Sequence, residues 1–578
     1  MGTGGRTVDD AAAAAAATPI LQHHLVHGSV DYKGQPATRS RSGRWRSASF
    51  IIVVEMAERF AYYGIGLNLI SYLTGPLGQS TATAAENVNA WTGTASLLPL
   101  LGAFLADSFL GRYWTIVIAS LLYVVGLGFL TLSAVLHSKS FNCQNAIDGG
   151  KCSPPKLEII FFFFSLYMVG LAQGGHKPCV QAFGADQFDT QDPLENKAKS
   201  SFFNWWYFGM NFGIFVALLV LTYIQDYLSW GLGFGIPCII MGLALITFLF
   251  GTVTYRFRQY SDNKNPFVRI GHVFVYATTN RKASTSEVLM ELEVQGVLPN
   301  KGSQQFMFLN KALLVPDASK GYKRASSMDE VEEAKAILRL APIWATCLGY
   351  ALVFSQTSTL FTKQGATMDR SIGSNLEVPA AAFQCFICIS IVVFMPLYDC
   401  VLVPFARALT GRPSGITMLQ RIGTGMVFSI LSMAIAAIVE KKRLRAAFDN
   451  GLVDRPGATL PISVCWLIPQ YTLVGISEAF SMVGLQEFFY DQMPCELKSI
   501  GLSLYLSIFG VGSFLSTFLI SIIDKATSRG GGDSWFSNNL NRAHLDYFYW
   551  LLAGLSTVIF AGYLYYSRLY IYKKANIV

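Results

Sequence analysis

The chain has 578 residues, of which 52% are hydrophobic and only 14% are charged. A soluble domain usually carries about a quarter charged residues, so this composition excludes an ordinary soluble protein. The net charge is +8, but the lysines and arginines are spread between apolar runs without forming a basic domain, so we expect no nucleic-acid partner.

Apolar stretches long enough to cross a lipid bilayer as helices follow one another along the chain. Six are predicted at 50–73, 90–109, 113–136, 157–181, 203–224 and 229–253, and six more at 336–360, 379–403, 415–439, 463–489, 500–523 and 545–569. This layout predicts an all-α polytopic membrane protein. Its twelve transmembrane helices would form two six-helix bundles, 50–253 and 336–570, joined by a polar linker, 254–335.

The segments outside the bundles are short or polar. We expect residues 1–49 to be a mostly disordered N-terminus, because they contain an alanine run and a basic cluster but nothing like the apolar core of a signal peptide. Residues 571–578 form a short tail. Ile20-Leu21 resembles half of a vacuolar sorting signal, but the acid expected upstream is missing, which favours the plasma membrane over the vacuolar membrane.

The distribution of positive charge predicts the orientation. Lysine and arginine are more frequent in the termini and the even-numbered connections than in the odd-numbered ones, so we expect both termini and the linker to face the cytosol. One predicted outer loop contradicts this rule, because four basic residues follow the ninth span: Lys441, Lys442, Arg443 and Arg445.

The first span contains three charged residues, Glu55, Glu58 and Arg59. Their i,i+3 and i,i+4 spacing places them on one helix face. Each would cost a few kcal/mol or more facing lipid, so this face must line the protein interior or a watery cavity. The cluster therefore either fixes helix packing as a structural ion pair or handles protons and substrate. We favour the second interpretation.

Two more charged residues lie deep in apolar spans. Lys177 is in the fourth span, beside Gly174, Gly175 and Pro178, and Glu478 is in the tenth. Neither has an opposite charge within one turn of its own helix, so each needs a partner elsewhere. We expect a Lys177–Glu478 contact between the bundles that is remade during the working cycle. The alternative is that each residue stabilises its own half, and we interpret His176 as a packing residue.

The cysteines predict no metal site. Cys385 and Cys388 form a C-x-x-C pair in an apolar span without a second pair, which indicates packing. Cys143 and Cys152, in a predicted outer loop, either form a disulfide or remain free. The sequence also contains no nucleophile–base arrangement and no phosphate-binding loop, so we do not expect an enzyme.

Several motifs carry a resemblance to a known family. The loop after the second span resembles the signature of the major facilitator superfamily, and Asp399 with Gly411-Arg412 resembles its degenerate repeat. The segment after the fourth span resembles the signature of proton-coupled oligopeptide transporters. Over about residues 31–570 the chain is identified as a member of the plant nitrate/peptide transporter family, on these stretches: Gly102-x-x-x-Ala106-Asp107-x-x-x-Gly111-Arg112, Phe183-Gly184-Ala185-Asp186-Gln187-Phe188-Asp189, Glu55-x-x-Glu58-Arg59 and Trp206-Tyr207-x-x-Met210-Asn211-x-Gly213.

The resemblance implies an alternating-access fold and proton symport, with no cofactor other than the proton gradient. It assigns proton coupling to Glu55, Glu58 and Arg59. It implies that the substrate is bound by Arg59, Tyr63, Lys177, Asn211 and Glu478, and that the cytosolic gating motifs use Asp107, Gly111, Arg112, Asp186 and Asp189.

The resemblance leaves the small-molecule substrate open. Two cationic groups and one carboxylate suit a zwitterion such as a di- or tripeptide, whereas nitrate needs only the cations. Some nitrate-transporting members have a seventh-span histidine where this chain has Phe354, which argues against that nitrate-binding mode. The family also moves hormones and specialised metabolites. A channel or a nutrient sensor is the alternative from a different class.

Two hydroxyl groups are candidate phosphorylation sites for a regulatory kinase. Thr115 and Ser327 each follow an arginine by three residues, Arg112 and Arg324. Phosphate would add up to about two negative charges. At Thr115 these charges would lie beside Arg112 and would disturb the predicted gating loop. The alternative is that Thr115 only starts a helix and that Ser327 lies in an inert linker.

Overall fold

The computed structural model describes residues 25–140, 155–189, 192–258, 266–280, 306–313, 326–372, 376–411, 416–493, 498–528 and 533–570. Predictions for residues 1–24, Cys143, Cys152, Arg412 and the tail 571–578 lie outside these ranges, as does much of the linker. The side chains of Asp107 and Asp399 also lie outside the description.

The first half of the chain is helical. Its long helices are α2 (Arg44–Gly66), α4 (Thr81–Leu105), α5 (Arg112–Ser140), α6 (Lys156–Ala185), α7 (Pro193–Val216) and α8 (Trp230–Gly251). Shorter helical segments connect or extend them: α3 (Leu69–Thr74), η1 (Ala106–Leu110), η2 (Ala217–Leu221), η3 (Ile224–Leu228) and η4 (Thr252–Thr254). Several helices have an N-cap residue whose side chain accepts a hydrogen bond from a backbone N–H of the first turn. Ser80 is the N-cap of α4, and Asp192 is the N-cap of α7.

The linker and the second half follow the same pattern. The linker contributes β3 (Phe257–Arg258), α9 (Pro266–Thr279) and η5 (Met307–Leu313). The long helices are α11 (Met328–Phe354), α13 (Cys385–Leu397), α15 (Met418–Asp449), α16 (Ile468–Asp491), α17 (Lys498–Thr527) and α18 (Leu545–Leu569). Shorter segments are α12 (Leu360–Ala366), η7 (Ala380–Gln384), η8 (Tyr398–Leu402), α14 (Val403–Thr410) and η9 (Val464–Leu467). Small strands also pair: β4 (Met368–Asp369) with β7 (Leu460–Ser463), and β5 (Ser371–Ile372) with β6 (Leu376–Glu377).

Every predicted span coincides with a helix. Among the described residues, ten helices are long and apolar enough to cross a membrane. The other two predicted spans, 50–73 and 463–489, correspond to α2 and α16. These two helices are less apolar because they contain the acidic residues of the predicted site, which only burial inside a protein makes acceptable at membrane depth.

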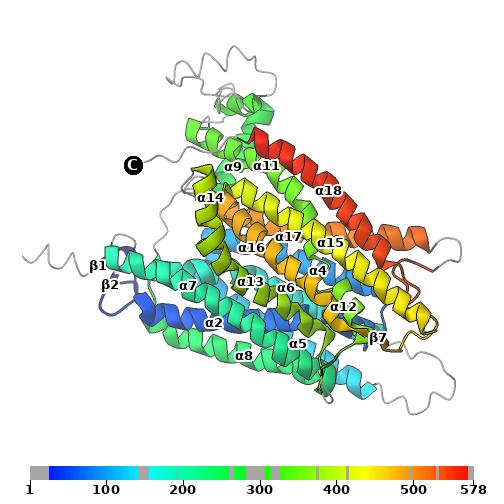
Figure 1. Cartoon of the computed structure of the whole chain (residues 1–578). Helices are drawn as coiled ribbons and strands as arrows, with labels where there is room; N and C mark the ends of the chain where they lie inside the picture. The colour runs from blue at the N-terminus through cyan, green and yellow to red at the C-terminus, as the bar shows by residue number, and fades with distance from the viewer. Residues whose placement is uncertain are drawn as a thin grey trace, which may run out of the picture.

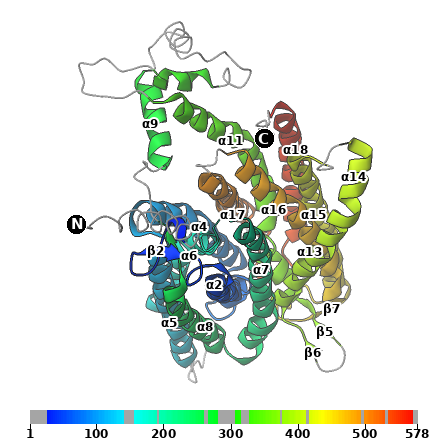
Figure 2. The same cartoon turned by 90° about the vertical axis from the view of Figure 1, so that its left-hand side faces the viewer.

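The helices pack within each half of the chain and meet along one seam. In the first half α5 packs on α6 and α8, and α2 on α7 and α8; in the second half α15 packs on α16 and α18, and α11 on α17 and α18. Figure 2 shows the two groups side by side, with α9 projecting beyond them. The groups meet where α4 crosses α17, because Gly93 and Gly510 allow close contact: a Cβ at Gly93 would lie 3.0 Å from the Gly510 carbonyl oxygen.

Further polar contacts join the halves away from the linker. We call the end of the molecule where α2 begins and α8 ends the linker end (Figure 1). At the opposite end, Lys363 Nζ donates to Thr74 Oγ1 at 3.0 Å. Gln384 also donates to the Leu67 carbonyl oxygen at 3.1 Å. These contacts hold the two halves together at the end opposite the linker.

The segment before α2 corrects one prediction. Residues 1–49 were expected to be mostly disordered, but β1 (Leu25–Val30) and β2 (Pro36–Thr38) form a sheet with β3 in the order β2-β1-β3. The prediction is therefore wrong for residues 25–49. The sequence could not show this, because the partner strand β3 lies more than two hundred residues later in the chain.

The structure explains one of the four basic residues after the predicted ninth span, Arg443, whereas Lys441, Lys442 and Arg445 are exposed. Helix α15 continues to Asp449, so these residues lie on the helix and not in a loop. Arg443 is fully buried and forms an ion pair with Glu440 at 2.6 Å. It also donates to Asn541 Oδ1 at 2.9 Å and to the Leu540 carbonyl oxygen at 2.6 Å. Arg443 is thus a packing residue and not a free charge of a loop.

The Glu440–Arg443 pair generates a stability prediction. Breaking a buried ion pair by removing one partner costs about 3–5 kcal/mol, because the other charge is left uncompensated. We expect Arg443→Met to lower the thermal unfolding temperature of the detergent-solubilised protein. Arg445→Ala, an exposed position on the same helix, is the control and should leave that temperature unchanged. Equal behaviour of the two variants would contradict a stabilising role for the pair.

Candidate functional site

The charged residues of α2 form one buried cluster. Arg59 Nε lies 2.7 Å from Glu55 Oε1 and 2.9 Å from Glu58 Oε2, and all three side chains are at most 3% exposed. Tyr123 of α5 donates to Glu58 Oε1 at 3.3 Å. The second carboxylate oxygen of Glu55 has no hydrogen-bond partner among the residues that the structure describes. The guanidinium between two carboxylates is what allows this much charge to remain inside the helix bundle.

Lys177 of α6 faces the same cluster. Helix α6 approaches α4 closely here, and this approach requires glycine. A Cβ atom added at Gly102 would lie only 2.1 Å from the Gly174 carbonyl oxygen. Lys177 interacts electrostatically with Arg59, Glu58 and Glu55. Two acids and two bases therefore share this part of the interior. We call Glu55, Glu58, Arg59 and Lys177 the α2–α6 charge cluster.

Glu478 of α16 belongs to a separate environment. Its charge acts on the hydroxyl groups of four tyrosines, which come from both halves of the chain: Tyr63, Tyr207, Tyr350 and Tyr505. Tyr63 also interacts with Arg59 and Glu58. Tyr63 thus lies between the α2–α6 charge cluster and Glu478.

The structure does not join Lys177 to Glu478. Both residues are described, and no ion pair between them is present in this conformation. The predicted contact between the halves, remade during the working cycle, therefore stays a prediction. Asn211 of α7 donates to the Tyr207 carbonyl oxygen of its own helix at 2.8 Å. Nearby, a Cβ at Gly213 would lie 2.6 Å from the Met56 carbonyl oxygen, so α7 contacts α2 closely beside Arg59.

The predicted gating residues Arg112, Asp186 and Asp189, whose side chains are described, form ion pairs at the linker end. Arg112 Nη1 lies 2.5 Å from Asp186 Oδ2, which joins the start of α5 to the end of α6. Asp189 lies 2.7 Å from Arg39 of the N-terminal segment. Gly111 has φ of +73°, a conformation that favours glycine and ends η1 just before α5.

Comparison with known proteins identifies the family. A family model described as "PTR2: POT family" matches residues 113–536, which is more than half of the chain. This chain belongs to the POT family.

Curated relatives match this POT family member over nearly its whole length. It is 61% identical over 561 residues to "Protein NRT1/ PTR FAMILY 5.10" of Arabidopsis thaliana, covering 97% of this chain and 98% of the relative. It is 55% identical to "Protein NRT1/ PTR FAMILY 5.14" of the same plant, covering 96% and 98%. The protein is therefore a multi-pass membrane transporter of the POT family.

Solved structures show the same fold. An auto-inhibited POT family peptide transporter superposes with a TM-score of 0.70 at 22% identity, covering 92% of this chain and 98% of the other. The POT family transporter PepTSo gives a TM-score of 0.67 at 22% identity, with 91% and 98% covered. At this identity the likeness concerns the fold alone.

Sequence reasoning missed the network that surrounds the family signature. Glu195, 1% exposed, lies 2.6 Å from Arg256 and 2.8 Å from Arg44. Its carboxylate also accepts the Asp189 backbone N–H at 2.7 Å. Gln187 links the signature to Arg256 through backbone and side-chain hydrogen bonds. The only signal in the sequence was an acid soon after the signature, since its partners are distant in the chain.

The two candidate phosphorylation sites differ in accessibility. Thr115 is 6% exposed and donates to the Gly111 carbonyl oxygen at 2.9 Å, so this conformation does not present its hydroxyl to a kinase. Ser327 is exposed and is the N-cap of α11, where it forms a capping box with Glu330. Modification of either residue stays a prediction, and the placement favours Ser327.

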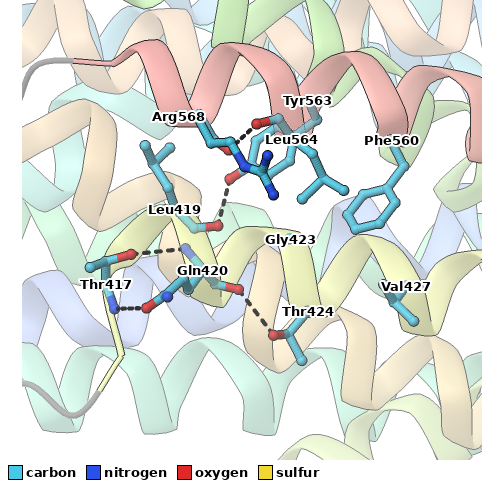
Figure 3. A pocket seen from close by; sticks show the side chains of 11 residues that line it. Thr417, Leu419, Gln420, Gly423, Thr424, Val427, Phe560, Tyr563, Leu564 and Arg568 are labelled. Carbon is cyan, nitrogen blue, oxygen red and sulfur yellow. Dashed lines mark hydrogen bonds between the residues drawn. The ribbon is translucent and has the colours of Figure 1, made fainter. Parts of the chain in front are cut away.

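A surface groove lies elsewhere. It has a volume of about 630 Å³ and runs between α15 and α18, beside Thr417, Gly423, Tyr563 and Arg568 (Figure 3). Tyr563 donates to the Leu419 carbonyl oxygen at 2.6 Å and so ties the two helices together there. The groove contains none of the predicted site residues, and its Val427 and Leu564 are exposed. The candidate site is therefore not this groove but the buried charged residues of α2, α6 and α16 described above.

Glu195 generates a pH prediction. Burial alone would raise the pKa of its carboxyl, but hydrogen bonds from Arg256, the Asp189 N–H and Arg44 lower the pKa below its ordinary value. A folded-state pKa below the unfolded value stabilises the protein above about pH 4.5, and this stabilisation is lost as the pH falls through the folded-state pKa. We expect Glu195→Gln to lower the unfolding temperature at pH 7, with a difference from wild type that shrinks towards pH 3.5.

The control for this measurement is Glu377→Gln, because Glu377 is half-exposed and lies outside the network. It should change the unfolding temperature little at any pH. A Glu195→Gln difference that stays constant from pH 7 to pH 3.5 would show that the carboxylate charge is not the stabilising feature.

Proposed function

We propose that this POT family transporter is a proton-coupled symporter that moves a small solute into the cytosol, with the linker end facing the cytosol. The observation that carries the proposal is the α2–α6 charge cluster. Its two acids are buried, share one guanidinium and lie beside a second cation. A structural ion pair needs one acid and one base, so the additional acid and lysine support a role beyond packing.

The cluster supports coupling through its charge balance. With all four groups ionised, the two acids and two bases cancel. A proton on either acid leaves a net positive charge inside the bundle, which weakens the hold on Arg59 and Lys177 and favours entry of a negatively charged substrate group. Proton and substrate would then bind together, as symport requires.

The arrangement favours a zwitterionic substrate, with di- and tripeptides as our first choice. Arg59 and Lys177 would bind a carboxylate, Glu478 would bind an ammonium group, and Tyr63 and Asn211 would line the space between them. Such opposite charges at two ends of one site select for a molecule that carries both. A solved relative with the same fold is described as a peptide transporter in complex with alafosfalin, which supports this choice.

Nitrate is the second candidate, because it needs only the two cations and because the curated relatives have NRT1/PTR names. A hormone or specialised metabolite with a carboxylate is a further possibility within the family. A channel or sensor would not need buried acids beside the cations. Accumulation of solute against its gradient, abolished by a protonophore, distinguishes a symporter from both.

The first functional prediction concerns the acids. In proteoliposomes with an imposed proton gradient, Glu55→Gln and Glu58→Gln should each abolish acid-stimulated accumulation, because a glutamine cannot exchange a proton. Glu158→Gln is the control, because Glu158 is an acid in the same half of the chain but lies in the first turn of α6, far along that helix from Lys177. This variant should accumulate solute as wild type does. An acid whose replacement leaves pH-dependent accumulation intact is not the coupling residue.

The second functional prediction separates peptide from nitrate. Hydrogen bonds to charged groups contribute about 1.5–3 kcal/mol, which corresponds to about a 10-fold to 150-fold change in affinity. If a peptide ammonium contacts Glu478, Glu478→Gln should weaken peptide binding by about that factor, and Lys177→Gln should weaken binding of both peptide and nitrate.

Binding should be measured apart from transport, by ligand-dependent thermal shift of the purified protein, so that coupling defects do not obscure it. Equal peptide affinity of wild type and Glu478→Gln would contradict recognition of an ammonium group and would favour the anion.

A further inference from the structure

His176 of α6 is a buried residue that the proposed mechanism does not yet use. From the sequence it was interpreted as a packing residue. In the structure its side chain is fully buried, and neither ring nitrogen has a hydrogen-bond partner among the described residues. A neutral imidazole has one N–H donor and one acceptor nitrogen. Leaving both unpaired in the interior is costly, so the position needs an explanation.

The groups around His176 give that explanation. One ring nitrogen and one carboxylate oxygen each of Glu55 and Glu58 lie within 4.8 Å of one another. Arg59 also acts on the imidazole electrostatically. From α5, the Tyr123 ring lies edge-on with its centroid 6.5 Å from that of His176. Lys177 is the next residue on α6 and interacts with the same two acids.

Helix α4, which also packs on this part of α6, offers no ionisable group at that level. Helix α4 contacts α6 through Leu98 and Gly102, where Gly174 allows the close approach. His176 therefore faces a short list of titratable groups: the two acids and Arg59 of α2, Lys177 of its own helix, and the phenol of Tyr123. Tyr123 already donates to Glu58, and Arg59 and Lys177 interact with the two acids, so the group left to donate to the imidazole is a carboxyl that has gained a proton.

A proton fits this space better than a metal ion. Two carboxylates and an imidazole are ligands that zinc accepts. However, both carboxylates already lie within 2.9 Å of the Arg59 guanidinium. A divalent cation would have to displace Arg59 and remain beside Lys177, where repulsion between like charges opposes it. A protonated carboxyl carries no charge and needs a hydrogen-bond acceptor instead.

We propose that His176 is a positioning residue for the transported proton: its neutral imidazole accepts a hydrogen bond from the protonated carboxyl of the Glu55–Glu58 pair. A hydronium ion gives its proton to a carboxylate oxygen: one O–H bond of hydronium breaks, water leaves, a carboxyl O–H bond forms, and that O–H points at the imidazole nitrogen. When the proton leaves, this nitrogen carries no hydrogen to donate, and the carboxylate keeps its contact with Arg59. His176 itself stays neutral throughout. This inference rests on the proposed function, since it assumes that the acids carry the proton.

The test compares two replacements of His176. Leucine fills the space without a polar atom, and glutamine supplies both an acceptor and a donor. Each variant is reconstituted into proteoliposomes, and two activities are measured: uptake driven by a proton gradient over external pH 4.5 to 8, and counterflow exchange at equal pH, which needs no net proton movement. His137→Leu, which changes the histidine paired with Glu158 at the far end of α5, is the control.

We expect His176→Leu to lower driven uptake at least about tenfold, the effect of losing one hydrogen bond to the proton-binding group. Its optimum should move to more acidic external pH, because the protonated carboxyl loses its acceptor and a higher proton concentration is then needed. Counterflow should stay within about twofold of wild type, and His176→Gln should restore most driven uptake.

Three outcomes would overturn the inference. One is a wild-type pH profile in His176→Leu. Another is an equal loss of driven uptake in the leucine and glutamine variants, which would indicate that only the imidazole shape matters. The third is a parallel loss of counterflow, driven uptake and folded protein, which would indicate a packing role. Failure of the proposed function appears separately, as pH-dependent uptake that survives Glu55→Gln and Glu58→Gln.

Discussion

The interaction on which the rest of this structure depends is the contact of Arg59 with Glu55 and Glu58 inside α2. Charged groups at membrane depth are tolerated only when they are paired and shielded from lipid. This requirement explains why α2 is surrounded by α6, α7 and α8. It also explains why Tyr123, Lys177 and His176 converge on one short segment of that helix.

Close helix packing makes this convergence possible. Glycines allow backbone contact where the charged groups need to meet: Gly213 sets α7 against α2 beside Arg59, and Gly102 with Gly174 sets α4 against α6 one turn before Lys177. Inside a bilayer the hydrophobic effect does not drive helices together, so their association depends on van der Waals packing. Small residues such as glycine allow that close packing. A Cβ at any of these positions would separate helices that hold the charge cluster together.

The two ends of the molecule are built differently. At the linker end, the family signature is held by ion pairs within the first half and its N-terminal sheet, such as Arg112–Asp186 and Arg256–Glu195. At the opposite end, polar contacts such as Lys363–Thr74 join one half to the other. At one end the described contacts join the two halves, and at the linker end the ion pairs named here lie within the first half. This arrangement suits alternating access, in which the halves move as units.

The sequence alone determined the helices and most of the charged site. Apolar stretches of span length fix where helices form, and three charges at helical spacing fix the face they share, because both depend on local chain geometry. Motif resemblance added the family. Only the tertiary structure decided what depends on distant segments. It paired β1 with β3 and buried Arg443 against Glu440 and Leu540. It also brought His176 to the acids of α2. These outcomes depend on how helices rotate and pack against one another, which the periodicity of a single helix does not specify.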